Sequence, residues 1–300
     1  MSDMNSEEEG MEKQFRTIDI SHLKCFAKGG TGECYRIDQD TILKLYYEGF
    51  PEERILNEKE GAKAALVAGV PTAISYWLVQ AGQRQGVLYE LVQGKTLSEV
   101  IYEKGISQAR ELGRTFADIA LTLHQAEVKK TDLPPATLTV RKAIQGAEYI
   151  PDEVMKRVLG FMDELDTFQQ YVHGDYHPNN VIMTKDGPIL VDMGGFSIGC
   201  PVFDLATCYF SLFEAPESHS GKRSSFNNLT QEEAGEFWKG VEEEYFPGGM
   251  DAASAELLRK VVLLKKMRFE ALYGKKYSPQ YCQAIREEVL SVFGNKDINS

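Results

Sequence analysis

The segment from His173 to Asn180, HGDYHPNN, holds two imidazoles, a carboxylate and two amides, and is named the Asp175 loop here. Asp175 and Asn180 have the spacing D-x4-N, and Asp192 follows twelve residues after Asn180 at the end of the apolar run ILVD. Amide and carboxylate oxygens are the ligands that a hard cation such as Mg²⁺ prefers. If Asn180 and Asp192 bind Mg²⁺, Asp175 stays free to orient or deprotonate an attacking hydroxyl.

The two histidines of the loop, His173 and His177, raise zinc as an alternative. Gly174 and Pro178 do not suit a regular helix, and the sequence lacks the Glu that stands between the histidines of the HExxH pattern. No cysteine is close by in the sequence to complete a zinc site. Zinc is therefore the weaker interpretation.

A glycine-rich stretch, KGGTGEC, lies between two strand-like runs. Gly29, Gly30, Thr31 and Gly32 would let backbone N–H groups approach a phosphate, because few side chains stand in the way. The stretch is not a Walker motif, which needs Gly-Lys-Ser/Thr at the start of a helix. Taken alone, it is more often a hairpin without a ligand.

Lys44 lies within the apolar run TILKLYY. Its ammonium could reach water at a strand edge, or it could reach into a cleft, bind phosphate oxygens and pair with a carboxylate. Glu58 and Glu60 of the following predicted helix are two residues apart, so only one of them can face the sheet. Ala62 and Leu66 share the face of Glu58, which favours Glu58 modestly as the partner.

In chain order, these features match the parts needed for phosphoryl transfer. The glycine-rich backbone and Lys44 would contact phosphates, Asn180 and Asp192 would bind Mg²⁺, and Asp175 would face the acceptor hydroxyl. Each feature is a weak or moderate signal alone. Their order and separations make the combination specific.

The secondary-structure pattern changes near residue 93. Strand-like runs and one helix (residues 51–70) come before it, and helical patterns dominate after it, interrupted by two short strands within residues 179–195. We therefore predict an α+β fold with a small β-rich N-terminal lobe and a larger helical C-terminal lobe. The predicted parts are a flexible tail (1–12), a nucleotide-binding lobe (13–92) and a catalytic, substrate-binding lobe (93–300).

Composition narrows the function classes. The 300 residues carry a net charge of -12 with a pI of about 5.0, which argues against a nucleic-acid partner. The five cysteines are odd in number and form no CxxC pair, which is typical of thiols in a reducing cytoplasm. The N-terminus lacks a signal-peptide pattern, and no apolar run approaches the ~20 residues of a membrane helix. We expect a cytoplasmic protein.

The chain resembles the aminoglycoside phosphotransferase and choline kinase-like family of the protein-kinase-like fold, in particular uncharacterised bacterial members. The resemblance rests on VHGDYHPNNVIM, LVDMGG, GVPTAISYWLV and LTLHQAE. Protein kinases usually have Arg before the loop Asp and Lys two residues after it, where this chain has Gly174 and His177. The motif FDLA begins at Phe203, 11 residues after Asp192, which leaves no long activation segment.

The resemblance implies an ATP- and Mg²⁺-dependent transfer to a hydroxyl of a small molecule that is aminoglycoside-, choline- or sugar-like. It implies that Asp175 is the catalytic acid/base, that Asn180 and Asp192 hold the metal, and that Lys44, supported by Glu58, contacts the nucleotide phosphates.

By the same resemblance, the hinge Tyr89–Val92 would offer backbone hydrogen bonds to adenine, with Glu90 and Val92 in the site. His173 would be structural, and Asp204 would fix the geometry of the loop rather than catalyse.

Two other functions stay open as alternatives: a protein kinase-like enzyme acting on a macromolecule, and a nucleotide-binding module without catalysis. The acidic stretch EEAGEFWKGVEEEYF could line a pocket for a cationic substrate, although a solvated helix face is the commoner meaning of such a charge run. No motif fixes the acceptor, the choice between ATP and GTP, or the oligomeric state.

Overall fold

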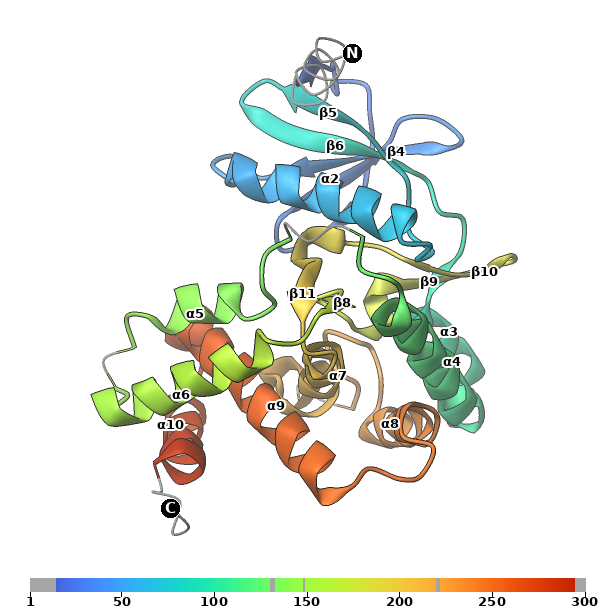
Figure 1. Cartoon of the computed structure of the whole chain (residues 1–300). Helices are drawn as coiled ribbons and strands as arrows, with labels where there is room; N and C mark the ends of the chain where they lie inside the picture. Colours follow the sequence, from blue (N-terminus) through green and yellow to red (C-terminus); the bar gives the residue numbers. More distant parts are fainter. Residues whose placement is uncertain (1–14, 130–132, 148, 220–221, 295–300) are drawn as a thin grey trace. The chain divides into compact units, whose positions relative to one another are not determined.

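The computed structural model describes residues 15–129, 133–147, 149–219 and 222–294 (Figure 1). The predicted tail, residues 1–12, lies outside the described residues. The chain divides into two compact units, one made of Met1–Gly94 with Ile182–Phe196 and the other of Lys95–Val181 with Ser197–Ser300. The first unit thus includes a segment that comes after the whole of the Asp175 loop in the sequence.

The first unit is built on a six-stranded sheet with the strand order β1-β5-β6-β4-β3-β2. β1 pairs with β5 in parallel, and the other neighbours are antiparallel. The strands are β1 (Arg16–Thr17), β2 (Cys25–Lys28), β3 (Gly32–Arg36), β4 (Thr41–Tyr46), β5 (Ser75–Ala81) and β6 (Arg84–Glu90). The predicted strands around the glycine-rich turn and around Lys44 are confirmed.

The register of the sheet sends alternate residues of β4 to opposite faces. Lys44 lies between Cys34 of β3 and Val87 of β6. Leu43 and Leu45 are fully buried and pack with Tyr35, Val79 and Ala81 into one hydrophobic cluster. Because side chains alternate along a strand, Lys44 projects from the other face.

Helix α2 (Glu52–Val67) packs against strands β5 and β6 of this sheet (Figure 1). Pro51 precedes its first residue, Glu52 and Glu53 lie in its first turn, and Gly69 takes a positive φ just after its end. Ile55 and Glu58 are among its buried residues. The helix therefore brings a carboxylate into the interior of the unit.

The segment Ile182–Phe196 joins the first unit through α2. It contains most of β9 (Val181–Thr184), then β10 (Gly187–Leu190) and the 3₁₀ turn η2 (Met193–Gly195). Gly61 of α2 is needed for the contact with η2, since a Cβ there would lie 2.7 Å from the Met193 carbonyl oxygen. This close approach sets the position of Asp192, the residue before η2.

The second unit is mostly helical, in agreement with the predicted helices. Its helices are α3 (Leu97–Lys104), α4 (Ile106–Gln125), α5 (Leu138–Ile144), α6 (Asp152–Leu165), α7 (Val202–Tyr209), α8 (Gln231–Tyr245), α9 (Ala252–Tyr273) and α10 (Pro279–Phe293). α7 continues into a π-helical stretch, Phe210–Glu214, in which the hydrogen-bonding pattern changes. α9 packs against α5, α7 and α10 (Figure 1).

Two glycines allow α4 and α8 to cross closely. A Cβ on Gly113 would lie 2.0 Å from the Phe237 carbonyl oxygen, and a Cβ on Gly240 would lie 1.9 Å from the Arg110 carbonyl oxygen. At this crossing Phe116 meets Phe237 edge-on, and it stacks on Tyr176 at 4.1 Å between ring centroids. Tyr176 belongs to the Asp175 loop, so the loop is anchored in the aromatic core of the unit.

Candidate active site

Three charged side chains meet in the first unit and form what we call the Lys44 cluster. The ammonium of Lys44 lies 2.7 Å from Oε1 of Glu58 and 2.9 Å from Oδ1 of Asp192. Tyr89 of β6 also donates its hydroxyl to Oε1 of Glu58, at 3.2 Å. The predicted contact between Lys44 and Glu58 is therefore present, whereas the roles of these residues toward a nucleotide stay predictions.

The three side chains of the cluster differ in how far they are exposed to solvent. The side chain of Glu58 is 7% exposed, that of Lys44 15% and that of Asp192 42%. Burial opposes the charge on Lys44, but attraction to Glu58 and Asp192 is stronger and holds the pKa of Lys44 above its ordinary value. Lys44 thus stays an ammonium in water at any ordinary pH.

The backbone conformation around Asp192 determines the position of its carboxylate. Asp192 has φ 63° and ψ 59°, in the left-handed region, which Asp and Asn tolerate better than most residues. A Cβ on Gly194 would lie only 3.2 Å from Oε2 of Glu58. The sequence DMGG therefore suits a turn that passes close over Glu58 and leaves Asp192 partly exposed.

The glycine-rich turn contains glycines of two kinds. Gly32 is required by packing, because a Cβ there would lie 2.5 Å from the Leu45 carbonyl oxygen. A Cβ on Gly30 would meet open space, one on Gly29 would only reach ordinary contact with the Gly32 carbonyl oxygen at 3.9 Å, and neither glycine has a positive φ. Packing explains Gly32 but not the other two, whose lack of side chains leaves the turn open to an approaching phosphate.

The hinge Tyr89–Val92 consists of the last two residues of β6 and the two residues that follow it. The Glu90 N–H donates to the Ile74 carbonyl at 2.9 Å, and the Leu91 N–H donates to the Asp40 carbonyl at 2.7 Å. Neither contact uses the Val92 N–H. Hydrogen bonds to neighbouring segments thus hold the backbone of the hinge. The adenine contacts at Glu90 and Val92 stay predictions.

In the second unit, Asp204 fixes the backbone of the Asp175 loop. Asp204, on α7, is fully buried and accepts the N–H groups of His173 and Gly174, each at 2.8 Å. Gly174 has φ 83°, a conformation that glycine adopts without strain. Asp204 therefore has the position expected of a residue that fixes loop geometry.

His124 supports Asp204 from α4. Its Nε2 lies 3.0 Å from Oδ2 of Asp204, and its Nδ1 lies 2.8 Å from the Tyr245 hydroxyl. Since a carboxylate only accepts, Nε2 carries the proton toward Asp204 and Nδ1 accepts from Tyr245. Burial would raise the pKa of Asp204, but the hydrogen bonds that it accepts from His124 and from the His173 N–H lower it instead.

Asn180 and His177 brace the end of the loop that carries the catalytic candidate. Nδ2 of Asn180 donates to the Asp175 carbonyl at 2.8 Å and lies 3.1 Å from Nε2 of His177. His177 packs edge-on against Phe226, at 4.9 Å between ring centroids. The hydrogen bonds of the Asn180 side chain use its amide nitrogen, so the amide oxygen is the atom left to bind a cation.

Asp175 has an exposed carboxylate on this fixed backbone. Its side chain is 55% exposed, with Oδ2 lying 3.6 Å from Nε2 of His177. Partial desolvation would raise the pKa of Asp175, but attraction to His177, His173 and Lys265 lowers it below the ordinary value. An ionised, accessible carboxylate of this kind can accept a hydrogen bond from a hydroxyl.

Asn180 of the second unit and Asp192 of the first carry oxygen donors, which suit Mg²⁺ better than zinc, and their joint binding of a metal stays a prediction. Asn180 offers an amide oxygen, and Asp192 offers Oδ2 beside the Oδ1 that meets Lys44. Over the described ranges, no three His, Cys, Asp or Glu side chains are grouped so that they could hold a metal. Mg²⁺ usually takes only one or two protein carboxylates and completes its shell with water and substrate phosphates.

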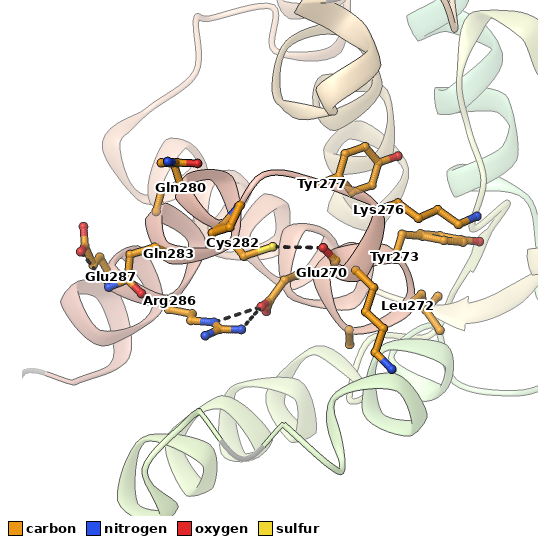
Figure 2. Close-up of a pocket in the computed structure, with 15 residues that line it drawn as sticks. Glu270, Leu272, Tyr273, Lys276, Tyr277, Gln280, Cys282, Gln283, Arg286 and Glu287 are labelled. Atoms are coloured by element: carbon orange, nitrogen blue, oxygen red, sulfur yellow. Dashed lines mark hydrogen bonds and ion pairs between the residues drawn. The ribbon is translucent and has the colours of Figure 1, made fainter.

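A separate hollow of about 1220 Å³ lies beside the C-terminal end of α9, the turn η5 (Gly274–Lys276) and α10 (Figure 2). Arg286 of α10 reaches Oε1 of Glu270 on α9, at 3.0 Å from Nε and 2.8 Å from Nη2. Arg286 and Glu270, which both line the hollow, thus pair through Oε1 of the carboxylate. The hollow therefore does not by itself indicate the charge of a ligand.

The family of the chain is shown by comparison with known proteins. The model of the phosphotransferase enzyme family matches residues 22–238, and the chain belongs to this family. A search of curated proteins gave no match. None of the helices in the described residues is long and apolar enough to cross a bilayer.

Solved structures confirm the predicted protein-kinase-like α+β fold. An amicoumacin kinase in complex with AMP-PNP and Ca²⁺ is 16% identical with a TM-score of 0.58, covering 96% of this chain and 93% of that one. ADP-bound aminoglycoside phosphotransferase APH(2'')-Ib is 14% identical with a TM-score of 0.56, covering 91% and 93%. Aminoglycoside-3'-phosphotransferase of type VIII is 17% identical with a TM-score of 0.55, covering 82% and 93%.

Some residues of the two sites were not singled out from the sequence. His124 lies in the quoted motif LTLHQAE, but its contact with Asp204 joins positions 80 residues apart. Lys265 of α9 donates to the Gly174 carbonyl at 3.3 Å, and nothing in the run LLKKMRFE distinguishes it from Lys266. Only the tertiary fold identifies these two.

Proposed function

We propose that this chain transfers the γ-phosphoryl group of ATP to a hydroxyl of a small molecule. The observation that carries the proposal is Asp175, an exposed carboxylate on a loop whose backbone is fixed by the buried Asp204. Phosphoryl transfer depends mainly on positioning and on charge, and a fixed loop with one accessible carboxylate supplies the positioning.

Asp175 would accept the proton of the attacking hydroxyl. Because its pKa is low, it is a weak base and first orients the hydroxyl through a hydrogen bond. As the bond from the acceptor oxygen to the γ-phosphorus forms, the bond to the ADP oxygen breaks and the acceptor proton passes to Asp175. A loose transition state suits this order, since the nucleophile needs little activation early.

The first unit would hold the nucleotide. Lys44 would exchange part of its contact with Asp192 for phosphate oxygens while Glu58 keeps it in place. Asn180 and Asp192 would bind Mg²⁺, which would neutralise charge on the phosphates. AMP-PNP and ADP in two structures of similar fold support the choice of an adenine nucleotide.

A small acceptor is favoured over a macromolecule. The 11 positions from Asp192 to Phe203 hold η2, the short strand β11 (Ser197–Gly199) and the start of α7, which leaves little chain to bind a peptide. Two of the proteins with a similar fold are an amicoumacin kinase and an aminoglycoside phosphotransferase. We therefore propose that the acceptor is a hydroxyl on a compact polar molecule. The proposal places the chain in the cytoplasm, where ATP is supplied.

The test is acceptor-dependent release of ADP. Purified protein with MgCl₂ and ATP is screened against aminoglycosides, choline, ethanolamine, sugars and amino sugars, and the product is identified by mass spectrometry. We expect at least one acceptor to gain a phosphate as ADP forms, with GTP run in parallel. Tight ATP binding with no phosphorylated product from any acceptor would instead support a nucleotide-binding module.

A further inference from the structure

Lys265 of the second unit contacts the backbone of the Asp175 loop. It comes from α9, outside residues 22–238, which the family model matches. Its ammonium donates to the Gly174 carbonyl at 3.3 Å and lies over the ring of Phe203 on α7, 5.1 Å from the centroid. It thus meets the loop one residue before Asp175.

The loop itself has no permanent positive charge. From Val172 to Met183 the sequence contains neither Lys nor Arg. The position two residues after Asp175, which is usually Lys in protein kinases, is His177. A phosphoryl group that approaches Asp175 would therefore meet a negative carboxylate, and the loop offers no permanent positive charge to offset their repulsion.

Lys265 differs from its neighbour on the same helix. Lys266 pairs with Glu214, at 3.0 Å, and also with Glu288. In the described part of the chain Lys265 forms no ion pair, and its recorded contacts are the Gly174 carbonyl and the Phe203 ring. A half-buried ammonium without a carboxylate partner is costly, and such placements are found preferentially at functional sites.

The charges around Lys265 are consistent with a role at the loop. Burial first, and then repulsion from Arg268 on α9, lower the pKa of Lys265 to about 8. Attraction from Asp204 on α7 and from Asp175 on the loop acts in the opposite direction. The same lysine helps to keep the pKa of Asp175 low.

We propose that Lys265 is a positioning residue for the transfer reaction: from α9 it holds the Gly174 carbonyl and places a positive charge beside the Asp175 carboxylate. This inference rests on the proposed function. A lysine of α9, far from the loop in the sequence, would then supply the positive charge that the loop itself lacks. The charge would hold Asp175 ionised and reduce its repulsion of the incoming phosphoryl group.

Lys265→Met, Lys265→Arg and the matched control Lys266→Met test the proposal by steady-state kinetics. We expect Lys265→Met to lower kcat on the order of 100-fold, with KM values for ATP and acceptor little changed, since a charge at the reacting centre acts mainly on the transition state. Lys265→Arg should restore most of kcat, and Lys266→Met should match the wild type. Wild-type kcat in Lys265→Met would overturn the proposal.

The pH profile separates an electrostatic role from a structural one. Wild-type kcat should fall above about pH 8 as Lys265 loses its proton. Lys265→Arg should keep its rate there, because a guanidinium stays charged. An alkaline fall that is identical in the wild type and Lys265→Arg would contradict the proposal.

A measurement without turnover separates this inference from the proposed function. In protein with ¹³C-labelled lysine side chains, the Lys265 signal is identified by its loss in Lys265→Met and titrated by NMR. Asp175→Asn should lower the pKa of Lys265, because an attraction is removed, and the exposed Asp186→Asn should leave it unchanged. An unchanged Lys265 titration in Asp175→Asn would refute the proposal even if no acceptor were found.

Discussion

The Lys44 cluster and the Asp175 loop differ in how their charges are satisfied. In the cluster, the functional side chains pair with one another, and Lys44 has a carboxylate on each side. In the loop, buried groups such as Asp204 bind the backbone, and the carboxylate of Asp175 is left accessible. Under the proposed function, the cluster would exchange contacts to admit a nucleotide, whereas the loop would need no such exchange for its acceptor.

This difference suggests a division of labour. Ion pairs that can be exchanged for phosphate contacts suit the binding of a nucleotide, since Lys44 stays charged throughout. A fixed backbone with one open carboxylate suits chemistry that depends on geometry. Substitutions in the cluster should therefore act mainly on nucleotide affinity, and substitutions in the loop mainly on the rate of transfer.

The largest effect is expected for Asp175→Asn. An amide cannot accept the hydroxyl proton, and loss of a general base lowers rates by about 10²- to 10⁴-fold. The turnover number for acceptor phosphorylation measures this, with Asp186→Asn, an exposed carboxylate in β-hairpin β9–β10, as the matched control. Near wild-type turnover in Asp175→Asn would remove Asp175 from the reaction.

Asp204→Asn should affect the stability of the second unit and, through the loop, its activity. Loss of one partner from a buried charged network costs about 3–5 kcal/mol, whereas Asp186→Asn should change the free energy of unfolding by less than about 0.5 kcal/mol. Urea unfolding of both variants measures the difference. A loss for Asp204→Asn no larger than that of the control would show that the loop does not depend on this contact.

The contribution of Asp204 to the free energy of unfolding should depend on pH. The pKa of Asp204 is lowered in the folded chain, so its contribution is fully present above the ordinary aspartate value of about 3.9 and is lost as the pH falls below it. The stability advantage of the wild type over Asp204→Asn should therefore shrink at acidic pH.

Lys44→Met should weaken nucleotide binding by about 10- to 100-fold, the value of one hydrogen bond to a charged group. It also leaves Glu58 and Asp192 near each other without a cation between them. Isothermal titration with ATP and Mg²⁺ measures the affinity. Equal affinity in the variant and the wild type would exclude Lys44 from the nucleotide site.

A smaller effect is expected for Glu58→Gln, which keeps the shape of the partner but removes its charge. We expect a loss of about 1 kcal/mol, or roughly fivefold in ATP affinity. Glu60→Gln is the matched control, because it is the other carboxylate that the sequence offers on the same helix, and it should stay within about twofold. If Glu60→Gln had the larger effect, the pairing of Lys44 with Glu58 would not govern binding.

Local patterns were sufficient to predict much of the two sites. The strand around Lys44 and the helical face of Glu58 follow from periods of two and about 3.6 residues, and the structure brings the two side chains to 2.7 Å. The D-x4-N spacing of the Asp175 loop is also local. Contacts that join distant segments could not be predicted in this way: His124 with Asp204, or Lys265 rather than Lys266 with the loop.

Parts of the fold were missed for the same reason. Helix α5, Leu138–Ile144, has only seven residues, too few for a clear helical period. The strands β8 (Gln170–Val172) and β11 pair with each other across 24 or more intervening positions, and each is three residues long. Such short elements are stabilised by tertiary contacts rather than by their own sequence pattern.

The central claim is that the Lys44 cluster binds the nucleotide and the Asp175 loop carries out the transfer. The most direct test measures both the ATP dissociation constant and the single-turnover rate at saturating ATP in Lys44→Met and Asp175→Asn. We predict that Asp175→Asn keeps the affinity and loses the rate, whereas Lys44→Met loses affinity first. Loss of ATP affinity in Asp175→Asn, with its single-turnover rate preserved, would contradict the account.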